Sequence, residues 1–160
     1  MRRFHATIIV CLIMALLVPL ADRLAVSDDT PTYTHYLYMT GHANWLHWAV
    51  NAWTLLVLHN LFRWYRVAAA YAFAVLMSYI MLPPMPMVGA SVFTCFFIGF
   101  AMPHLWTKSR LTVGMTAALL MLTCILPGFA GIQHVTASAF GLAFSYGEGF
   151  CRNLKNDLME

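Results

Sequence analysis

The feature that most constrains the fold is a long segment, from Val67 to Thr107, that contains no Asp, Glu, Lys or Arg. It is about twice as long as the roughly 20 apolar residues that one helix needs to cross a bilayer. Pro83, Pro84 and Pro86 interrupt it near its middle, where prolines would end a helix. The segment therefore predicts two membrane-spanning helices in succession.

The composition of the whole chain has the same character. Of its 160 residues, 61% are hydrophobic and 9% are charged, and the mean hydropathy is +0.71. In lipid, only helices and closed barrels satisfy their own backbone hydrogen bonds. The apolar runs are long and lack the alternation of barrel strands. The sequence therefore predicts an all-α, polytopic membrane protein.

Short polar or proline-containing breaks divide the chain into six apolar segments. The predicted spans, within one domain of residues 1–160, are residues 4–24, 41–62, 64–82, 88–106, 111–127 and 132–149. The first run is also compatible with a signal peptide, although residues 24–27 form a poor cleavage region. We expect a retained span, because the run exceeds a usual signal core and the rest of the chain is itself membrane-spanning.

The basic residues predict the orientation of these spans. With a cytoplasmic N-terminus, eight of the nine fall on the inner side and Arg23 falls on the outer side. The eight are Arg2, Arg3, Arg63, Arg66, Lys108, Arg110, Arg152 and Lys155. Both termini are therefore expected in the cytoplasm, and spans two, four and six are expected to start at the outer face.

The remaining aromatic and cysteine residues have simpler interpretations. An interfacial aromatic belt is the expectation for Tyr33, Tyr36, Tyr38, Trp45 and Trp48, which lie in or next to the polar outer loop. A role as small buried hydrophobes, without disulfides or zinc, is the expectation for Cys11, Cys95, Cys124 and Cys151.

Polar side chains gather near the outer ends of three spans. His47 and Asn51 are four residues apart and share a helix face, whereas His42 would point about 140° away on the same helix. Ser91 and His134 begin spans four and six at the same depth. Polar residues inside a membrane are costly, so this convergence predicts a functional site.

The residue types suit acyl transfer. Ser91 follows Gly89 at a helix N-terminus, where free N–H groups and the helix dipole stabilise an oxyanion. His134 is a possible base for the serine, and no carboxylate lies at this depth, so the arrangement predicts a Ser–His dyad. His47 and Asn51 are the expected oxyanion donors.

Other interpretations of these residues stay open. The Gly-x-Ser sequence is also common in helix packing, and intramembrane histidines also serve as structural hydrogen-bonding groups. The two histidines of the second span could instead be metal or haem ligands, and a haem between His59 and His104 is conceivable. However, no His-Glu-x-x-His motif is present, and the outer histidines lack a tetrahedral ligand set. We therefore expect no metal and no cofactor.

The pattern resembles the rhomboid family of intramembrane serine proteases. Three motifs carry the resemblance: His42-x4-His47-x3-Asn51, Gly89-x-Ser91 and His134-x2-Ala137-x3-Gly141. The resemblance implies a six-helix rhomboid-like bundle with Ser91 as nucleophile and His134 as general base. It also implies an oxyanion hole made by His47, Asn51 and the Ser91 N–H, with His42 supporting the site. Ala137 and Gly141 let helices approach closely.

The resemblance also implies the kind of reaction and partner. Such a protein cleaves transmembrane helices of substrate proteins near the outer face, with lateral entry near spans two and five and a cap formed by Pro127–Gly131. We expect a multi-pass protein of a bacterial inner membrane that contacts transmembrane substrates and lipid, and no nucleic acid.

Two positions depart from the family pattern. Val92 stands where the family usually has glycine, and Cys95 stands where an aromatic residue often stacks on the catalytic histidine. The Trp-Arg pair typical of the first outer loop is also absent from residues 27–41. These differences support an alternative, a catalytically inactive rhomboid-like protein that binds membrane helices. Retention of all four chemical groups favours an active protease.

Overall fold

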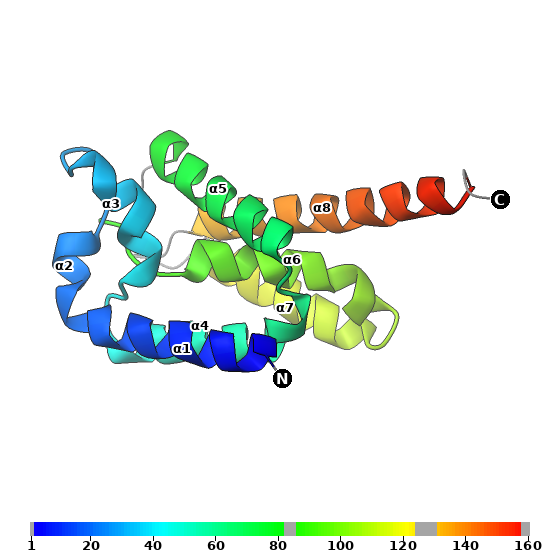
Figure 1. Ribbon diagram of the computed structural model, residues 1–160, viewed down its shortest axis with the longest axis horizontal. Coiled ribbons are helices and arrows are strands. Elements are labelled where there is room, and N and C mark those ends of the chain that lie inside the picture. Colours follow the sequence, from blue (N-terminus) through cyan, green and yellow to red (C-terminus); the bar gives the residue numbers. More distant parts are fainter. Residues whose placement is uncertain (1, 82–85, 124–130, 158–160) are drawn as a thin grey trace.

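The computed structural model describes residues 2–81, 86–123 and 131–157 as a bundle of helices (Figure 1). The helices are α1 (Arg2–Leu17), η1 (Val18–Leu20), α2 (Ala21–Leu24), α3 (Thr32–Leu37), η2 (Tyr38–Thr40), α4 (Trp45–Leu58), η3 (His59–Leu61), α5 (Trp64–Ile80), α6 (Ser91–Trp106), α7 (Arg110–Thr123) and α8 (Gly131–Asp157). Across these ranges the extended pairing is limited to one isolated antiparallel bridge between Val26 and Met87. The predicted all-α class is confirmed.

Each of the six apolar segments contains a helix. The first covers α1, η1 and α2, the second covers α4 and η3, and the others contain α5, α6, α7 and α8 in turn. In the described part of the chain, one helix is long and apolar enough to cross a membrane: Arg3–Leu24, with 22 residues and a mean hydropathy of 2.5. The apolar helix Ser91–Trp106 is shorter.

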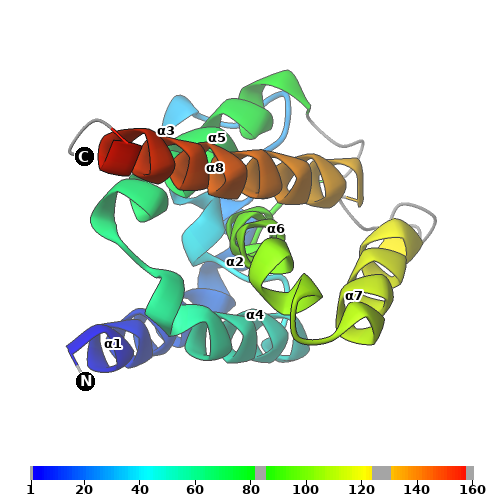
Figure 2. The same cartoon turned by 90° about the vertical axis from the view of Figure 1, so that its right-hand side faces the viewer.

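Helix α6 lies at the centre of the bundle, with α4, α5, α7 and α8 packed around it (Figure 2). It carries apolar residues on every side, and a helix of that kind is stable only when it is surrounded. Phe96, Phe97 and Phe100 are fully or almost fully buried. Phe96 contacts Phe140 and Phe144 of α8.

Small residues bring α6 and α8 into backbone contact. A Cβ atom added at Gly141 would overlap the carbonyl of Phe96, and one added at Gly99 would overlap the carbonyl of Ser138. Ala137 is completely buried in the same contact. The predicted close approach through Ala137 and Gly141 is therefore confirmed.

The outward faces of the helices are strongly apolar. On α1 the side chains of Ile9, Leu12, Ile13 and Leu16 are exposed, and Leu16 is 78% exposed. Contiguous apolar surface of this kind is rare on proteins that face water and marks a surface that contacts lipid or another protein.

One of the tyrosine predictions is wrong. Tyr33 and Tyr36 are exposed, as an interfacial role requires, but Tyr38 is completely buried. Its hydroxyl donates a hydrogen bond to the Ala74 carbonyl of α5 at 2.9 Å. The pKa of Tyr38 is raised, chiefly because burial disfavours the phenolate. Tyr38 thus packs this segment against α5.

One cysteine prediction is also wrong. Cys11 and Cys95 are buried as expected, but Cys151 is exposed. It lies on α8, which continues to Asp157, past the predicted end of the span at residue 149. Figure 1 shows this part of α8 projecting beyond the other helices. Cys124 lies outside the described residues.

Candidate active site

The path of the chain into α6 places Ser91 at the first position of that helix, after the N-cap residue Ala90. Gly89 has a φ of +125°, which favours glycine. A Cβ atom added at Gly89 would also lie 2.5 Å from Cε1 of His47. Glycine is therefore required here both by the backbone and by the nearby imidazole.

Two segments that precede α4 in the chain, around Val26 and Tyr38, hold residues 87–89 in place. Val26 and Met87 exchange two backbone hydrogen bonds of 2.8 and 2.9 Å. The N–H of Gly89 donates to the Tyr38 carbonyl at 2.8 Å. These contacts fix the backbone of the residues just before Ser91 from a neighbouring segment of the chain.

His42 supports the same approach, but from outside a helix. The Asn44 side chain caps α4 by accepting the His47 N–H at 2.8 Å, so the helix starts at Trp45 and the expected helical position of His42 is wrong. Nε2 of His42 is 3.5 Å from the Ala90 N–H and accepts from it. His42 is completely buried, and its ring packs edge-on against His47 with centroids 5.2 Å apart.

Ser91 and His134 meet directly. Nε2 of His134 lies 2.8 Å from Oγ of Ser91, which confirms the expected closeness of the two side chains. Ser91 is half-buried and His134 is 7% exposed. In the neutral tautomer with its proton on Nδ1, the imidazole accepts from the serine hydroxyl. This is the geometry that a base needs to take the hydroxyl proton.

The N-terminal turn of α6 adds donors beside this pair. The N–H of Thr94 is the first in the helix to find a backbone acceptor, the Ala90 carbonyl, at 2.8 Å. The backbone N–H of Ser91 precedes it, in the turn that has no intrahelical acceptors. The N–H of Ser91 and the positive end of the helix dipole are therefore available to an anion next to Oγ.

Asn51 is linked to α6 through Thr94. Oδ1 of Asn51 lies 3.1 Å from the Thr94 hydroxyl, which is also 2.9 Å from the Ser91 carbonyl. Nδ2 of Asn51 donates to the His47 carbonyl at 2.9 Å. One N–H of this amide is thus engaged and the second remains available for a substrate oxygen.

His47 lies one helical turn before Asn51 on α4, with its ring against Gly89. It is half-buried, whereas Asn51 is 4% exposed. The two predicted oxyanion donors therefore approach the start of α6 from the same helix. The arrangement gathers a hydroxyl, an imidazole and polar donors at one end of the bundle.

The two departures from the family pattern are accommodated by packing. The side chain of Val92 is 1% exposed and packs in the same buried cluster as Val26 and Ala137. Cys95 lies in that cluster too, and its carbonyl accepts from the Ser138 hydroxyl at 3.0 Å. The contact between Ser91 and His134 is 2.8 Å with both residues present.

The histidines considered for haem have other partners. Nδ1 of His59 lies 2.7 Å from the Leu56 carbonyl, and its ring contacts Phe4. The His104 ring contacts Phe100. No group of three or more potential metal ligands occurs among the residues that were placed, 2–81, 86–123 and 131–157.

Two predictions concern the access route. The proposed cap, Pro127–Gly131, lies outside the described residues except for Gly131, the first residue of α8. The fifth span corresponds to α7, which packs against α6 and α8 at the side of the bundle (Figure 2). Lateral entry between spans two and five stays a prediction.

Two residues that shape the site, Thr94 and Tyr38, were not predicted from the sequence to do so. Thr94 carries a hydroxyl one turn after Ser91, in an otherwise apolar helix, and that position was the available signal. Tyr38 was assigned to the membrane interface, and no pattern in the sequence indicates that its carbonyl binds Gly89. No protein-family model, curated protein or solved structure matches this chain.

Proposed function

We propose that the chain is a rhomboid-type intramembrane serine endopeptidase that cleaves transmembrane helices near the outer face of the membrane. The observation that carries the proposal is the 2.8 Å contact between Ser91 Oγ and His134 Nε2. It joins the first turn of α6 to the first turn of α8, with Asn51 and His47 alongside. Packing alone does not require a hydroxyl, a base and oxyanion donors together.

The reaction follows from these groups. Ser91 Oγ attacks the scissile carbonyl carbon while Nε2 of His134 takes the hydroxyl proton. The resulting oxyanion accepts from the Ser91 N–H and from side-chain donors of Asn51 and His47. The imidazolium then protonates the leaving amine, and the peptide C–N bond breaks. Water, deprotonated by His134, releases the acyl group and restores Ser91.

The proposal includes six membrane spans with both termini in the cytoplasm of a bacterial cell. The distribution of basic residues and the apolar outer faces of the helices support it. The first span is part of the fold in this account, because Cys11 and Met14 pack in a cluster with Ala52, Leu55 and Ala90. Trp48 also donates to the Cys11 carbonyl at 3.0 Å.

The second candidate is an inactive rhomboid-like protein that binds membrane helices. The specific observation in its favour is the pair Val92 and Cys95, which replace residues that flank the serine in the family. Active and inactive versions predict the same fold and differ in whether a peptide bond is broken.

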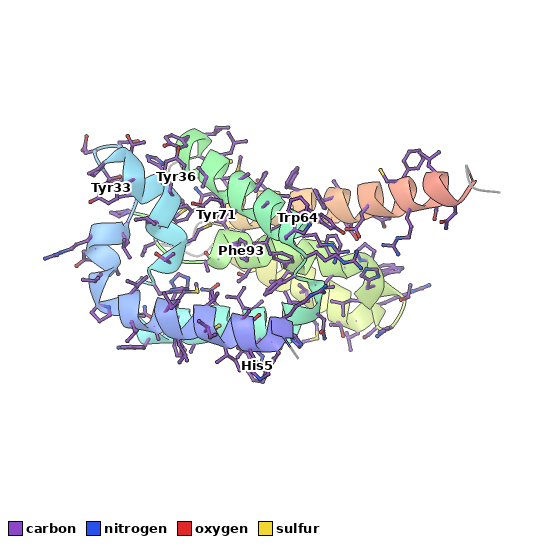
Figure 3. The ribbon with its side chains drawn as sticks, in the orientation of Figure 1. His5, Tyr33, Tyr36, Trp64, Tyr71 and Phe93 are labelled. Carbon is purple, nitrogen blue, oxygen red and sulfur yellow. The ribbon has the colours of Figure 1, made fainter. Side chains whose placement is uncertain are left out.

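A reconstituted cleavage assay separates the two. In liposomes with a model transmembrane substrate, we expect wild-type protein to cut the substrate and Ser91→Ala or His134→Ala to abolish cutting. Ser145→Ala on α8 and His5→Ala are matched controls, since His5 points away from the bundle (Figure 3). Unchanged cleavage by Ser91→Ala would exclude the dyad. Substrate binding without cleavage by wild-type protein would favour the inactive alternative.

A further inference from the structure

A cleft of about 530 Å³ separates α1 from α5, away from the Ser91–His134 pair. Its walls include Val10 and Met14 from α1, Leu55 from α4, and Tyr71 from α5. Phe93 of α6 forms its floor and lies in the space between α1 and α5 (Figure 3). We call this cleft the α1–α5 groove.

The groove is elongated. On α1 its lining residues run from Arg3 to Met14 at helical spacing, which corresponds to about 16 Å along the helix axis. Arg3 and Phe62 line it toward the end that we assign to the cytoplasm. Thr40 and Ala90 line it toward the outer end. Ala90 is next to Ser91 in the chain, but neither Ser91 nor His134 lines the groove.

The lining is apolar except for a few groups. Among the described residues that line the groove, Arg3 is charged and none is an aspartate or a glutamate. One guanidinium N–H of Arg3 donates to the Asn60 carbonyl at 3.2 Å. A guanidinium carries five N–H donors, so four remain for an anion.

The volume limits what can occupy the groove. It falls within the range of about 300–1,000 Å³ that is usual for small-molecule pockets. A single hydrocarbon chain matches the apolar lining of the groove.

We infer that the α1–α5 groove binds one acyl chain of an anionic glycerophospholipid from the cytoplasmic leaflet. The acyl chain lies along α1 toward Ala90, and the lipid phosphate binds Arg3. Anionic lipids are concentrated in that leaflet, where basic residues attract them. The inference rests on the membrane orientation in the proposed function, and it does not depend on proteolysis.

Lipid retention tests this inference. Protein purified in dodecylmaltoside is mixed with equal amounts of dioleoyl phosphatidylglycerol and dioleoyl phosphatidylcholine, and bound lipid is counted by native mass spectrometry. We expect one tightly bound phosphatidylglycerol, about tenfold preferred over phosphatidylcholine. Arg3→Gln should remove the preference, whereas Arg110→Gln, an inner-side arginine outside the groove, should keep it.

Filling the groove tests the acyl site separately. Ala6→Phe should reduce retention of both lipids to background while circular dichroism shows an intact helical fold. If that variant does not fold, Ile13→Phe, further along the same wall, carries the test. Unchanged retention in a folded groove-filling variant, or equal losses in Arg3→Gln and Arg110→Gln, would overturn the inference.

The same samples keep the two proposals apart. Covalent labelling of Ser91 by a fluorophosphonate in wild-type protein, without lipid retention, would support the proposed protease activity and overturn the lipid site. Lipid retention without serine labelling would support the lipid site and count against proteolysis.

Discussion

At the scale of single residues, the site depends on how the first turn of α6 is held. Gly89 has a backbone conformation that favours glycine, and its lack of a side chain leaves room for the His47 ring. Thr94 joins Asn51 to the same turn by a hydroxyl that is 3.1 Å from the amide oxygen. The backbone around Ser91 is thus fixed by contacts on both sides of that residue in the chain.

Thr94→Val should weaken catalysis without preventing substrate binding. Loss of the hydroxyl removes one of the two hydrogen bonds that hold the Asn51 amide, so this proposed oxyanion donor is less firmly placed. We expect kcat to fall about tenfold, equivalent to about 1.4 kcal/mol, with KM unchanged. Kinetics in liposomes with a transmembrane substrate measure both constants. Thr94→Ser should retain activity, and full activity of the valine variant would contradict this role.

Part of the residue-level account was readable from the sequence. Ser91, His134, His47 and Asn51 were identified because polar groups in apolar helices are few and their depths follow from the positive-inside pattern. The position of Tyr38 was not readable, because it depends on contacts with distant segments, whereas that of His42 follows from a local helix cap. For His42 the Asn44 cap, which shortens α4, decided the outcome.

At the scale of elements, the contact between α6 and α8 brings the serine and histidine together. The two helices touch at backbone level because glycine lies at the closest points on both. A second link between distant helices joins α5 to α8: Arg66 Nε donates to Glu148 Oε2 at 2.8 Å. The Arg66 guanidinium also lies 4.3 Å from the Phe100 ring centroid on α6.

Gly141→Ala should separate α6 from α8. The added methyl group would overlap the Phe96 carbonyl. This carbonyl belongs to the backbone of α6, so it cannot move aside as the end of a flexible side chain could. We expect the free energy of unfolding to fall by about 1–3 kcal/mol, as in other overpacked cores. We also expect loss of fluorophosphonate labelling at Ser91. Thermal unfolding in detergent measures the first effect.

Gly147→Ala is the matched control on the same helix. A Cβ atom there meets nothing within 4 Å. Since alanine favours helix over glycine, that variant should be stabilised by up to about 1 kcal/mol. Equal destabilisation of both variants would contradict close packing at Gly141.

Glu148→Gln should destabilise the bundle strongly. Arg66 is 6% exposed, so loss of its partner leaves a buried and unpaired charge. Removing one member of a buried pair typically costs about 3–5 kcal/mol. Thermal unfolding checks the value.

Arg152→Gln provides the comparison for Glu148→Gln. Its guanidinium is 3.4 Å from Glu148, but the Arg152 side chain is 66% exposed. Exposed pairs on a helix contribute about 0.3–0.5 kcal/mol. A larger effect from Arg152→Gln than from Glu148→Gln would show that the buried pair does not hold α5 to α8.

At the scale of the whole molecule, the proposed function depends on how the helices are oriented in the membrane. The helical class and the approximate position of each helix were predictable, because apolar runs and proline breaks are strong signals. Six apolar segments predict six spans, whereas in the described part of the chain one helix, Arg3–Leu24, is long and apolar enough to cross a membrane. Helices such as α4 and α6, with 14 and 16 residues, are shorter than the about 20 residues that span an average bilayer. In the proposed orientation, helices this short would be accommodated by local thinning of the bilayer or by oligomerisation.

Reporter fusions test the orientation. Alkaline phosphatase, which is active only outside the cytoplasm, should be active when fused after Asp29 and at least about tenfold less active after Asp157, as the positive-inside pattern requires. A fluorescent protein that folds in the cytoplasm should give the reverse pattern. High phosphatase activity after Asp157 would place the end of α8 outside the cytoplasm and contradict the proposed orientation.

The most direct test of the central claim is covalent labelling of Ser91 by a fluorophosphonate in folded protein within a bilayer. We expect mass spectrometry to find one adduct, on Ser91, and to find none in His134→Ala. An absence of labelling in folded wild-type protein, with labelling restored by Val92→Gly, would instead identify an inactive relative whose site has been closed.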